Sequence, residues 1–155
     1  MFTLKPFQET AVAQIKEKFL TLWKLGDNNL NLTFKSPTGS GKTIMMAQFL
    51  RDIVDDPRFS HADVGFLWIT NSDTLAMQSK DKLFSYYGGA SENPLIDMND
   101  LRDGSIPKNG IFFINWQKIK GKTKDSRKLR RENEQGLTFD NFINETHDEG
   151  RKIVV

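Results

Sequence analysis

Two nearly continuous runs of apolar residues constrain the fold of this chain more than any other feature. Residues 64–70, VGFLWIT, read as a strand that is covered on both faces, because a half-exposed strand would alternate apolar and polar residues. Residues 110–115, GIFFIN, read as a second strand of this kind, and RKIVV at 151–155 starts another. Helical patterns separate these strands. The sequence therefore predicts an α/β fold with three layers and a mostly parallel sheet.

The segments between the strands are predicted from their periodicity. Apolar residues at helical spacing and terminal Pro and Gly residues predict helices over residues 6–25, 42–54, 72–84 and 138–146. The stretch LNLTFK at 30–35 alternates Leu30, Leu32 and Phe34, which predicts a further strand of the sheet. Residues 88–110 are rich in Gly, Pro, Asn and Asp and are expected to form loops.

Composition excludes several classes of protein. The 155 residues suit about one domain, and the absence of cysteine excludes disulfides and thiolate metal sites. The start of the chain is not a secretory signal and no run of eighteen apolar residues occurs, so we expect a cytoplasmic protein without a membrane partner. The net charge is only +2, but residues 118–131 hold eight Lys or Arg and one Asp.

The stretch SPTGSGKT at 36–43 has the composition of a phosphate-binding loop. Glycines allow consecutive backbone amides to surround phosphates, and the start of the following helix favours an anion. Lys42 is placed to reach the outer phosphates, and the Thr43 hydroxyl can bind Mg²⁺. The alternative is a flexible Ser/Gly turn before a helix. The predicted nucleotide-binding residues of the loop are Pro37, Thr38, Gly39, Ser40, Gly41, Lys42 and Thr43.

The serine that opens this loop resembles the start of motif I in superfamily-two helicases and translocases. Gln8, in the stretch KPFQ, resembles the glutamine that reads adenine in many of these enzymes. An amide side chain both donates and accepts hydrogen bonds, which suits an adenine edge. An exposed glutamine beside a helix start is the alternative. The resemblance implies ATP and Mg²⁺ as ligands.

The stretch NSDTLAMQ at 71–78 resembles motif Ia of the same superfamily, with Asn71 in place of the usual proline. This motif holds nucleic-acid phosphates, so the resemblance implies DNA contacts by Ser72, Thr74 and Gln78. An ordinary helix cap at Ser72 is the alternative interpretation.

Two further stretches narrow the resemblance. LKPFQETAV near the start and FINWQKI at 113–119 look like segments of the restriction (Res) subunits of type III restriction enzymes. The resemblance implies that residues 1–155 form the N-terminal portion of a RecA-like helicase domain. It also implies a parent enzyme that translocates on DNA, cleaves it as an endonuclease and binds a modification methyltransferase subunit. We interpret Trp116 as a core residue in preference to a surface that stacks on bases.

An acidic signature, Asp-Glu-x-His or a variant, follows the strand that RKIVV resembles in this superfamily and holds Mg²⁺ and water. The sequence stops at Val155, and the upstream His147-Asp148-Glu149 is expected to be a solvated helix end. We therefore expect an N-terminal fragment of a larger enzyme or a truncated gene product, without ATP turnover of its own.

Other functions stay open at this point. The parent is alternatively another superfamily-two DNA or RNA helicase, or the chain is a non-catalytic nucleotide-binding module. A nucleotide kinase shares the loop, but Ser36, Gln8 and the motif Ia-like segment argue against it. The basic tract either binds DNA phosphates or is an exposed lysine-rich loop, and residues 118–136 are expected to be an insertion with little regular structure.

Overall fold

The fold was analysed in a computed structural model that describes residues 3–26, 30–89, 93–100, 104–121 and 138–155. Its helices and strands are α1 (Pro6–Leu25), α2 (Lys42–Val54), β1 (Val64–Thr70), α3 (Asp73–Tyr87), β2 (Leu95–Ile96), β3 (Ile111–Asn115), α4 (Trp116–Lys120), α5 (Phe139–Asp148) and β4 (Lys152–Val154). The four predicted helices are confirmed, each within three residues of its expected ends. Among the described residues, no helix has the length and apolarity that are needed to span a membrane.

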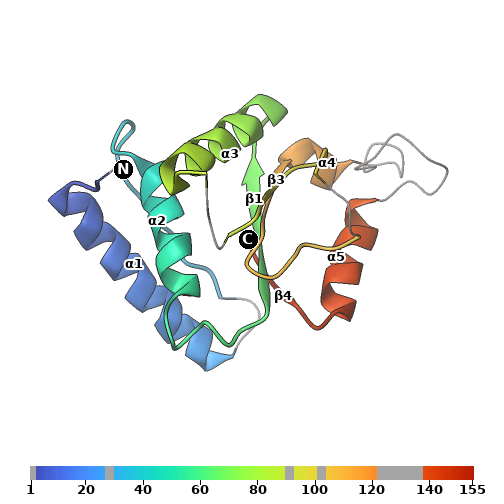
Figure 1. Ribbon diagram of the computed structural model, residues 1–155, viewed down its shortest axis with the longest axis horizontal. Coiled ribbons are helices and arrows are strands. Elements are labelled where there is room, and N and C mark those ends of the chain that lie inside the picture. Colours follow the sequence, from blue (N-terminus) through green and yellow to red (C-terminus); the bar gives the residue numbers. More distant parts are fainter. Residues whose placement is uncertain (1–2, 27–29, 90–92, 101–103, 122–137) are drawn as a thin grey trace.

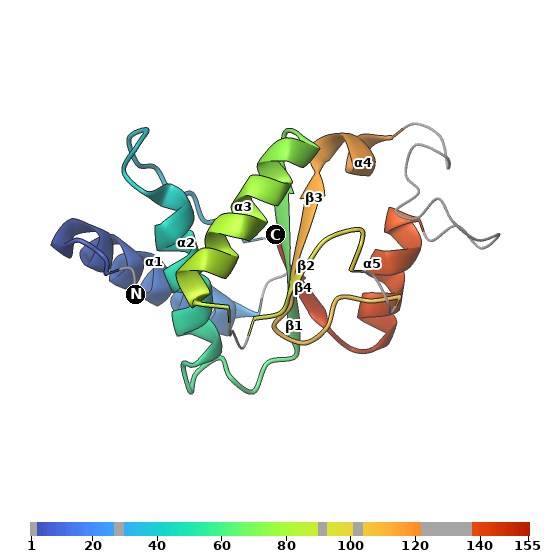
Figure 2. The same ribbon diagram turned by 45° about the horizontal axis from the view of Figure 1, so that its top comes forward.

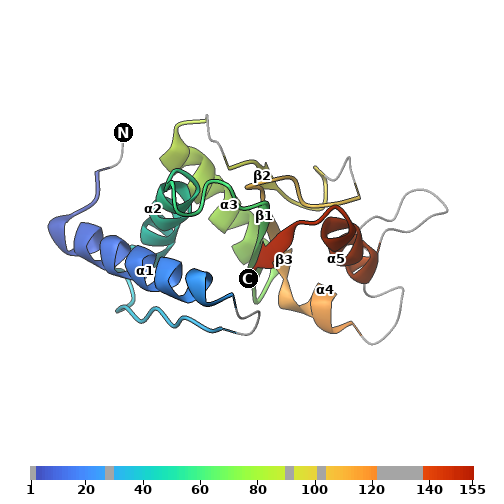
Figure 3. The same ribbon diagram turned by 90° about the horizontal axis from the view of Figure 1, so that it is seen from below.

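The four strands form one parallel sheet in the order β2-β3-β1-β4. Helices α1, α2 and α3 lie on one side of this sheet and α5 lies on the other, as Figures 1 and 3 show. The predicted α/β class, with three layers and a parallel sheet, is therefore confirmed. In a parallel sheet all carboxyl ends lie at one edge, which places the connections to α3 and α4 together.

Side-chain alternation along β1 and β3 builds two separate cores. Phe66 and Phe113 face the helices of the first layer and belong to the larger core cluster. Leu67 and Phe112 face the opposite layer, where Phe112 lies 4.7 Å from Phe142 of α5, measured between ring centroids. Both faces are buried, which explains why the two strands read as continuous apolar runs.

The first helix is held against the rest of the domain by an aromatic cluster and by ion pairs. The ring of Trp23 lies 4.8 Å from that of Phe59, in the connection that follows α2. In the same connection Arg58 donates to both carboxylate oxygens of Glu17, at 2.9 and 2.7 Å, and to those of Asp56, at 2.9 and 2.8 Å. Lys16 lies 3.1 Å from Asp56. These contacts fix the orientation of α1.

The predicted strand over residues 30–35 is wrong. The segment is extended but pairs with no strand among the described residues. Strand β4 pairs with β1 through three residues, and its other edge has no strand partner in the described part of the chain. An apolar groove of about 1040 Å³, which Leu30 and Leu32 help to line, runs along β4. The alternation of apolar and polar residues at 30–35 is typical of a strand, but a strand also needs a neighbouring strand to pair with, and alternation does not predict that neighbour.

The interpretation of Trp116 as a core residue is also wrong. Trp116 is the first residue of α4, a helix of five residues that the sequence did not indicate, and 42% of its surface is exposed. The chain turns immediately after the buried Asn115, so Trp116 points away from the sheet that the preceding residues build. The residues of β3 are buried, but this burial does not continue to Trp116, the residue after the strand.

Candidate functional site

The loop over residues 36–41 has the backbone conformation that a phosphate-binding loop requires. Gly39 and Gly41 have φ angles of 81° and 88°, values that favour glycine. Gly41 is also the N-cap of α2, and the first bond of this helix runs from the Met45 amide to the Gly41 carbonyl at 3.0 Å. The preceding amides therefore have no acceptor within the helix, and they surround the positive end of its dipole.

The side chain of Lys42 folds back over this loop. Its ammonium donates to the carbonyl oxygens of Ser36 and Pro37, at 2.9 Å each. The Ser36 and Ser40 hydroxyls bond each other, and the Ser40 amide donates to the Pro37 carbonyl at 3.3 Å. The loop thus curls around a single cation at the start of a helix, an arrangement that attracts a polyanion.

Gln8 of α1 lies against the same loop, as the family resemblance implied. Its amide nitrogen donates to the Ser40 carbonyl at 2.8 Å, and its oxygen accepts from the Lys5 amide at 2.8 Å. A Cβ atom added at Gly41 would come within 2.5 Å of the Gln8 amide nitrogen. A larger residue at position 41 would have to displace the Gln8 amide, and its backbone would be strained at this φ angle. The role of Gln8 in reading adenine stays a prediction.

These residues fit the triphosphate and Mg²⁺ that the motif implies. The two glycine conformations leave the backbone open, Lys42 supplies positive charge, and Thr43 lies in the first turn of α2, where a hydroxyl can reach a metal bound to the phosphates. In the described ranges no group of three or more His, Cys, Asp or Glu side chains can hold a metal ion directly.

A second set of predicted residues lies at the carboxyl edge of the sheet. Ser72 is the N-cap of α3, and its hydroxyl accepts from the Leu75 amide at 3.3 Å, as the capping interpretation predicted. Thr74 and Gln78 are exposed on α3. The structure therefore brings these three residues onto one helix, and their contact with DNA stays a prediction.

The sequence did not predict the side-chain contact that joins the end of β3 to the start of α3 at the carboxyl edge of the sheet. The side-chain amide of Asn115, at the end of β3, donates to the carboxylate of Asp73, the first residue of α3. The Asn115 oxygen accepts from the Lys118 amide at 2.9 Å and so caps α4. A polar residue at the end of a buried strand was the available signal. The connections to α3 and α4 are thereby fastened to each other.

The carboxylates nearest to β4 do not lie at this edge. Val154 pairs with Phe66, four residues before the end of β1, so β4 stops roughly 13 Å below the level of Thr70 at about 3.3 Å per residue. Asp148 and Glu149 precede β4 and lie at its amino end. Glu149 accepts from the Ser105 hydroxyl at 2.7 Å, and this bond together with Arg151 lowers the pKa of Glu149.

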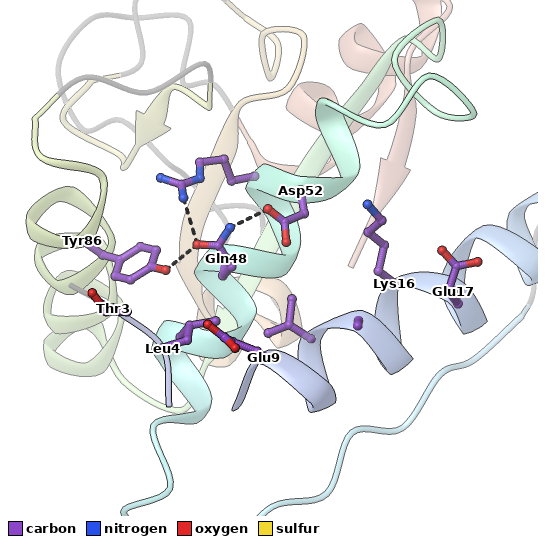
Figure 4. A pocket seen from close by; sticks show the side chains of 11 residues that line it. Thr3, Leu4, Glu9, Lys16, Glu17, Gln48, Asp52 and Tyr86 are labelled. Carbon is purple, nitrogen blue, oxygen red and sulfur yellow. Dashed lines mark hydrogen bonds between the residues drawn. The ribbon is translucent and has the colours of Figure 1, made fainter. Parts of the chain in front are cut away.

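A separate pocket of about 560 Å³ lies between α1, α2 and α3 (Figure 4). Gln48 is at its centre, where its side-chain oxygen accepts from the Tyr86 hydroxyl and from Arg51, and its nitrogen donates to Asp52. Burial raises the pKa of Tyr86, although the nearby Arg51 lowers it in part. The described lining residues include no member of the loop at 36–43. This polar network joins α3 to α2, the helix that follows the loop.

Of the basic tract at 118–131, only the start lies within the described residues. Lys118 and Lys120 belong to α4, which corrects the expectation of little regular structure for these positions. Residues 122–137 lie outside the described part of the chain.

Comparison with known proteins agrees with the geometry. The family model of the type III restriction enzyme, res subunit, matches residues 1–151, whereas searches of curated proteins and of solved structures give no match. A parallel sheet flanked by helices is consistent with the RecA-like domain of this family, whose match implies the ATP-binding region of a superfamily-two helicase or translocase. The family generally uses ATP and Mg²⁺, and it implies a DNA substrate. This chain belongs to the family of the type III restriction enzyme res subunit.

Proposed function

We propose that this chain is the nucleotide-binding portion of an ATP-driven DNA translocase in a restriction system, acting with a modification methyltransferase subunit. One observation carries the proposal. The Lys42 ammonium sits inside a loop whose two glycines have left-handed φ angles, at the start of a 13-residue helix. The Lys42 ammonium, the backbone of the loop and the start of α2 therefore lie at one place. This arrangement is the one that binds the phosphates of a nucleotide.

Each residue of the loop has a role in this proposal. Residues 38–41 would surround the phosphates with backbone amides. Lys42 would release the Ser36 and Pro37 carbonyls to pair with the outer phosphates, and the Thr43 hydroxyl would help to hold Mg²⁺. Gln8 exchanges its bonds to the Lys5 amide and the Ser40 carbonyl for bonds to the adenine edge. Bound ATP would supply the phosphoryl group whose hydrolysis drives movement.

The proposal includes binding without turnover by these 155 residues alone. Hydrolysis needs a carboxylate that holds Mg²⁺ and a group that orients water. The carboxylates of Asp148 and Glu149 lie at the amino end of β4, and Glu149 is engaged by Ser105. Asp73, at the carboxyl edge, is bonded to Asn115.

Titration with a fluorescent ATP analogue in the presence of Mg²⁺ tests the proposal. Lys42→Ala should weaken affinity by about 10- to 100-fold, because a bond to a charged group contributes roughly 1.5–3 kcal/mol. Lys35→Ala is the matched control, since Lys35 is an exposed lysine just before the loop, and its affinity should stay within about twofold of the wild type. Equal nucleotide affinity of the wild type and Lys42→Ala would show that the loop at 36–43 is not the nucleotide site. Steady-state phosphate release that Lys42→Ala abolishes would contradict binding without turnover.

A further inference from the structure

Trp116 differs from the other two tryptophans of the chain in its surroundings. Trp23 lies 4.8 Å from the Phe59 ring and Trp68 lies 5.8 Å from the Phe113 ring, so both are built into the core of the first layer. Trp116 has no such aromatic partner among the described residues, and 42% of its surface is exposed. A large apolar ring that no core contact requires is a candidate for recognition.

The charge around this ring favours a polyanion. The Lys120 ammonium lies 5.0 Å from the centre of the Trp116 ring, a cation–π contact within one turn of α4. Lys118 lies on the same short helix, and the sequence continues into the basic tract that runs to residue 131. An aromatic ring with a lysine over one face combines a stacking surface with a phosphate contact, which is the chemistry that binds single-stranded nucleic acid.

The position of Trp116 in the fold gives this surface a firm base. Thr70 and Asn115 are paired neighbours at the ends of β1 and β3, so α3 and α4 start side by side at one edge of the sheet (Figure 2). The bond between Asn115 and Asp73 holds the two starts together. Trp116 directly follows Asn115 and the exposed Thr74 directly follows Asp73, so Trp116 lies at the point where the two helix starts are joined.

We propose that Trp116 stacks on a base of single-stranded DNA, with Lys120 holding the adjacent phosphate. The inference rests on the proposed function, which supplies DNA as the partner, and it adds the strand state and the residue that contacts the base. Stacking needs a base with a free face, so an intact duplex cannot use this ring. Direct stacking is tolerant of sequence, which suits a protein that moves along DNA.

Fluorescence anisotropy with a labelled 20-mer of deoxythymidine tests the inference. Trp116→Ala should weaken binding by about 5- to 100-fold, because base stacking on an aromatic ring contributes roughly 1–3 kcal/mol. Trp116→Phe keeps a ring and should restore most of the affinity. The matched control is Phe84→Ala, at an aromatic residue on α3 with 58% exposure, which should bind like the wild type. Affinity for a blunt 20-base-pair duplex should not change in Trp116→Ala.

Two further readouts separate stacking from a structural effect. The 20-mer should quench the tryptophan fluorescence of the wild type, and Trp116→Phe should lose most of this quenching while it still binds. Lys120→Ala should lower the slope of log K against log salt by about 0.7, the value for one phosphate contact on a single strand. Thermal unfolding of each variant by circular dichroism shows whether the fold is retained.

Several results would overturn the inference. These are wild-type affinity of Trp116→Ala for the 20-mer, an equal loss for the duplex, or quenching that persists in Trp116→Phe. Wild-type affinity together with self-association that Trp116→Ala abolishes would instead assign Trp116 to a protein contact. Binding of the ATP analogue is measured separately on the same variants. If Lys42 still determines nucleotide affinity while Trp116 does not affect DNA affinity, the proposed function stands and this inference fails.

Discussion

The loop before α2 and the connection before α3 both lead into a helix at the same end of the molecule, but they are supported in different ways. The connection before α3 follows β1, which has a strand neighbour on each side. The Thr70 hydroxyl donates to the Ser72 carbonyl at 2.8 Å, Ser72 caps the helix, and Asp73 is bonded to Asn115 of the neighbouring strand. The residues before α3 are therefore held both by the pairing of β1 with its neighbouring strands and by side-chain hydrogen bonds.

The loop before α2 has no such foundation within the described residues. It follows the extended segment 30–35, which pairs with no described strand, and its shape depends on bonds within the loop and on Gln8 of α1. Helix α1 is in turn held by Asp56 and Arg58. The loop before α2 therefore owes its shape to local contacts, whereas the starts of α3 and α4 are positioned by the sheet.

Removal of Asn115 is the largest expected perturbation. Asn115→Ala deletes a buried amide that bonds a carboxylate and caps α4, so we expect a loss of about 2–4 kcal/mol in the free energy of unfolding. The matched change in the other region, Asn31→Ala at an exposed position, should cost at most about 0.5 kcal/mol. Urea denaturation measures both losses in the free energy of unfolding. Similar losses in the two variants would show that the two regions are supported to the same degree.

Two alanine substitutions inside the loop sharpen the comparison. Gly39 and Gly41 both have positive φ angles, so either substitution strains the backbone by about 1–2 kcal/mol. The added Cβ at Gly41 would also collide with Gln8, whereas at Gly39 no atom lies within 4 Å. Gly41→Ala should therefore lower nucleotide affinity by at least about tenfold, and by more than Gly39→Ala does. A titration in which the two variants lose equal affinity would show that Gln8 does not shape the loop.

The smallest expected effect is a response to acid. Hydrogen bonds from Arg58 hold the pKa of Asp56 far below its usual range. Since the unfolded pKa is about 3.9, the charged form stabilises the fold above that pH, and the contribution is lost as the pH falls toward the folded-state value. Asp56→Asn should make stability less dependent on pH below about 4, which urea denaturation at several pH values measures.

Acid should also affect the two regions unequally. Because Asp56 anchors α1 and α1 carries Gln8, exchange of the loop amides at 36–41 should rise before that of the amides at 70–75. A simultaneous rise in both regions would indicate global unfolding, and it would contradict the dependence of the loop on α1.

Much of this fold was predictable because its strongest signals are local. The apolar runs at 64–70 and 111–115 follow from burial on both faces, and Ser72 caps α3 as its residue type suggests. The approach of Gln8 to the loop was predicted from a family resemblance and not from periodicity.

The errors concern relations between distant parts of the chain. Whether residues 30–35 pair depends on a free strand edge more than a hundred residues away, at β4. The exposure of Trp116 depends on a turn that begins at Asn115, and the bond from Asn115 to Asp73 joins residues 42 positions apart. Alternation and propensity carry no information about such partners.

Hydrogen–deuterium exchange with and without ATP and Mg²⁺ tests most directly whether the loop before α2 is the nucleotide site. At a nucleotide concentration that just saturates the wild type, we expect slower exchange of the amides at 36–45, little change at 70–76, and a much smaller response at 36–45 in Lys42→Ala. The amides at 36–45 respond because they surround the phosphates and are otherwise held only by local contacts. Unchanged exchange at 36–45 in the wild type, or equal protection in Lys42→Ala, would show that this loop does not bind the nucleotide.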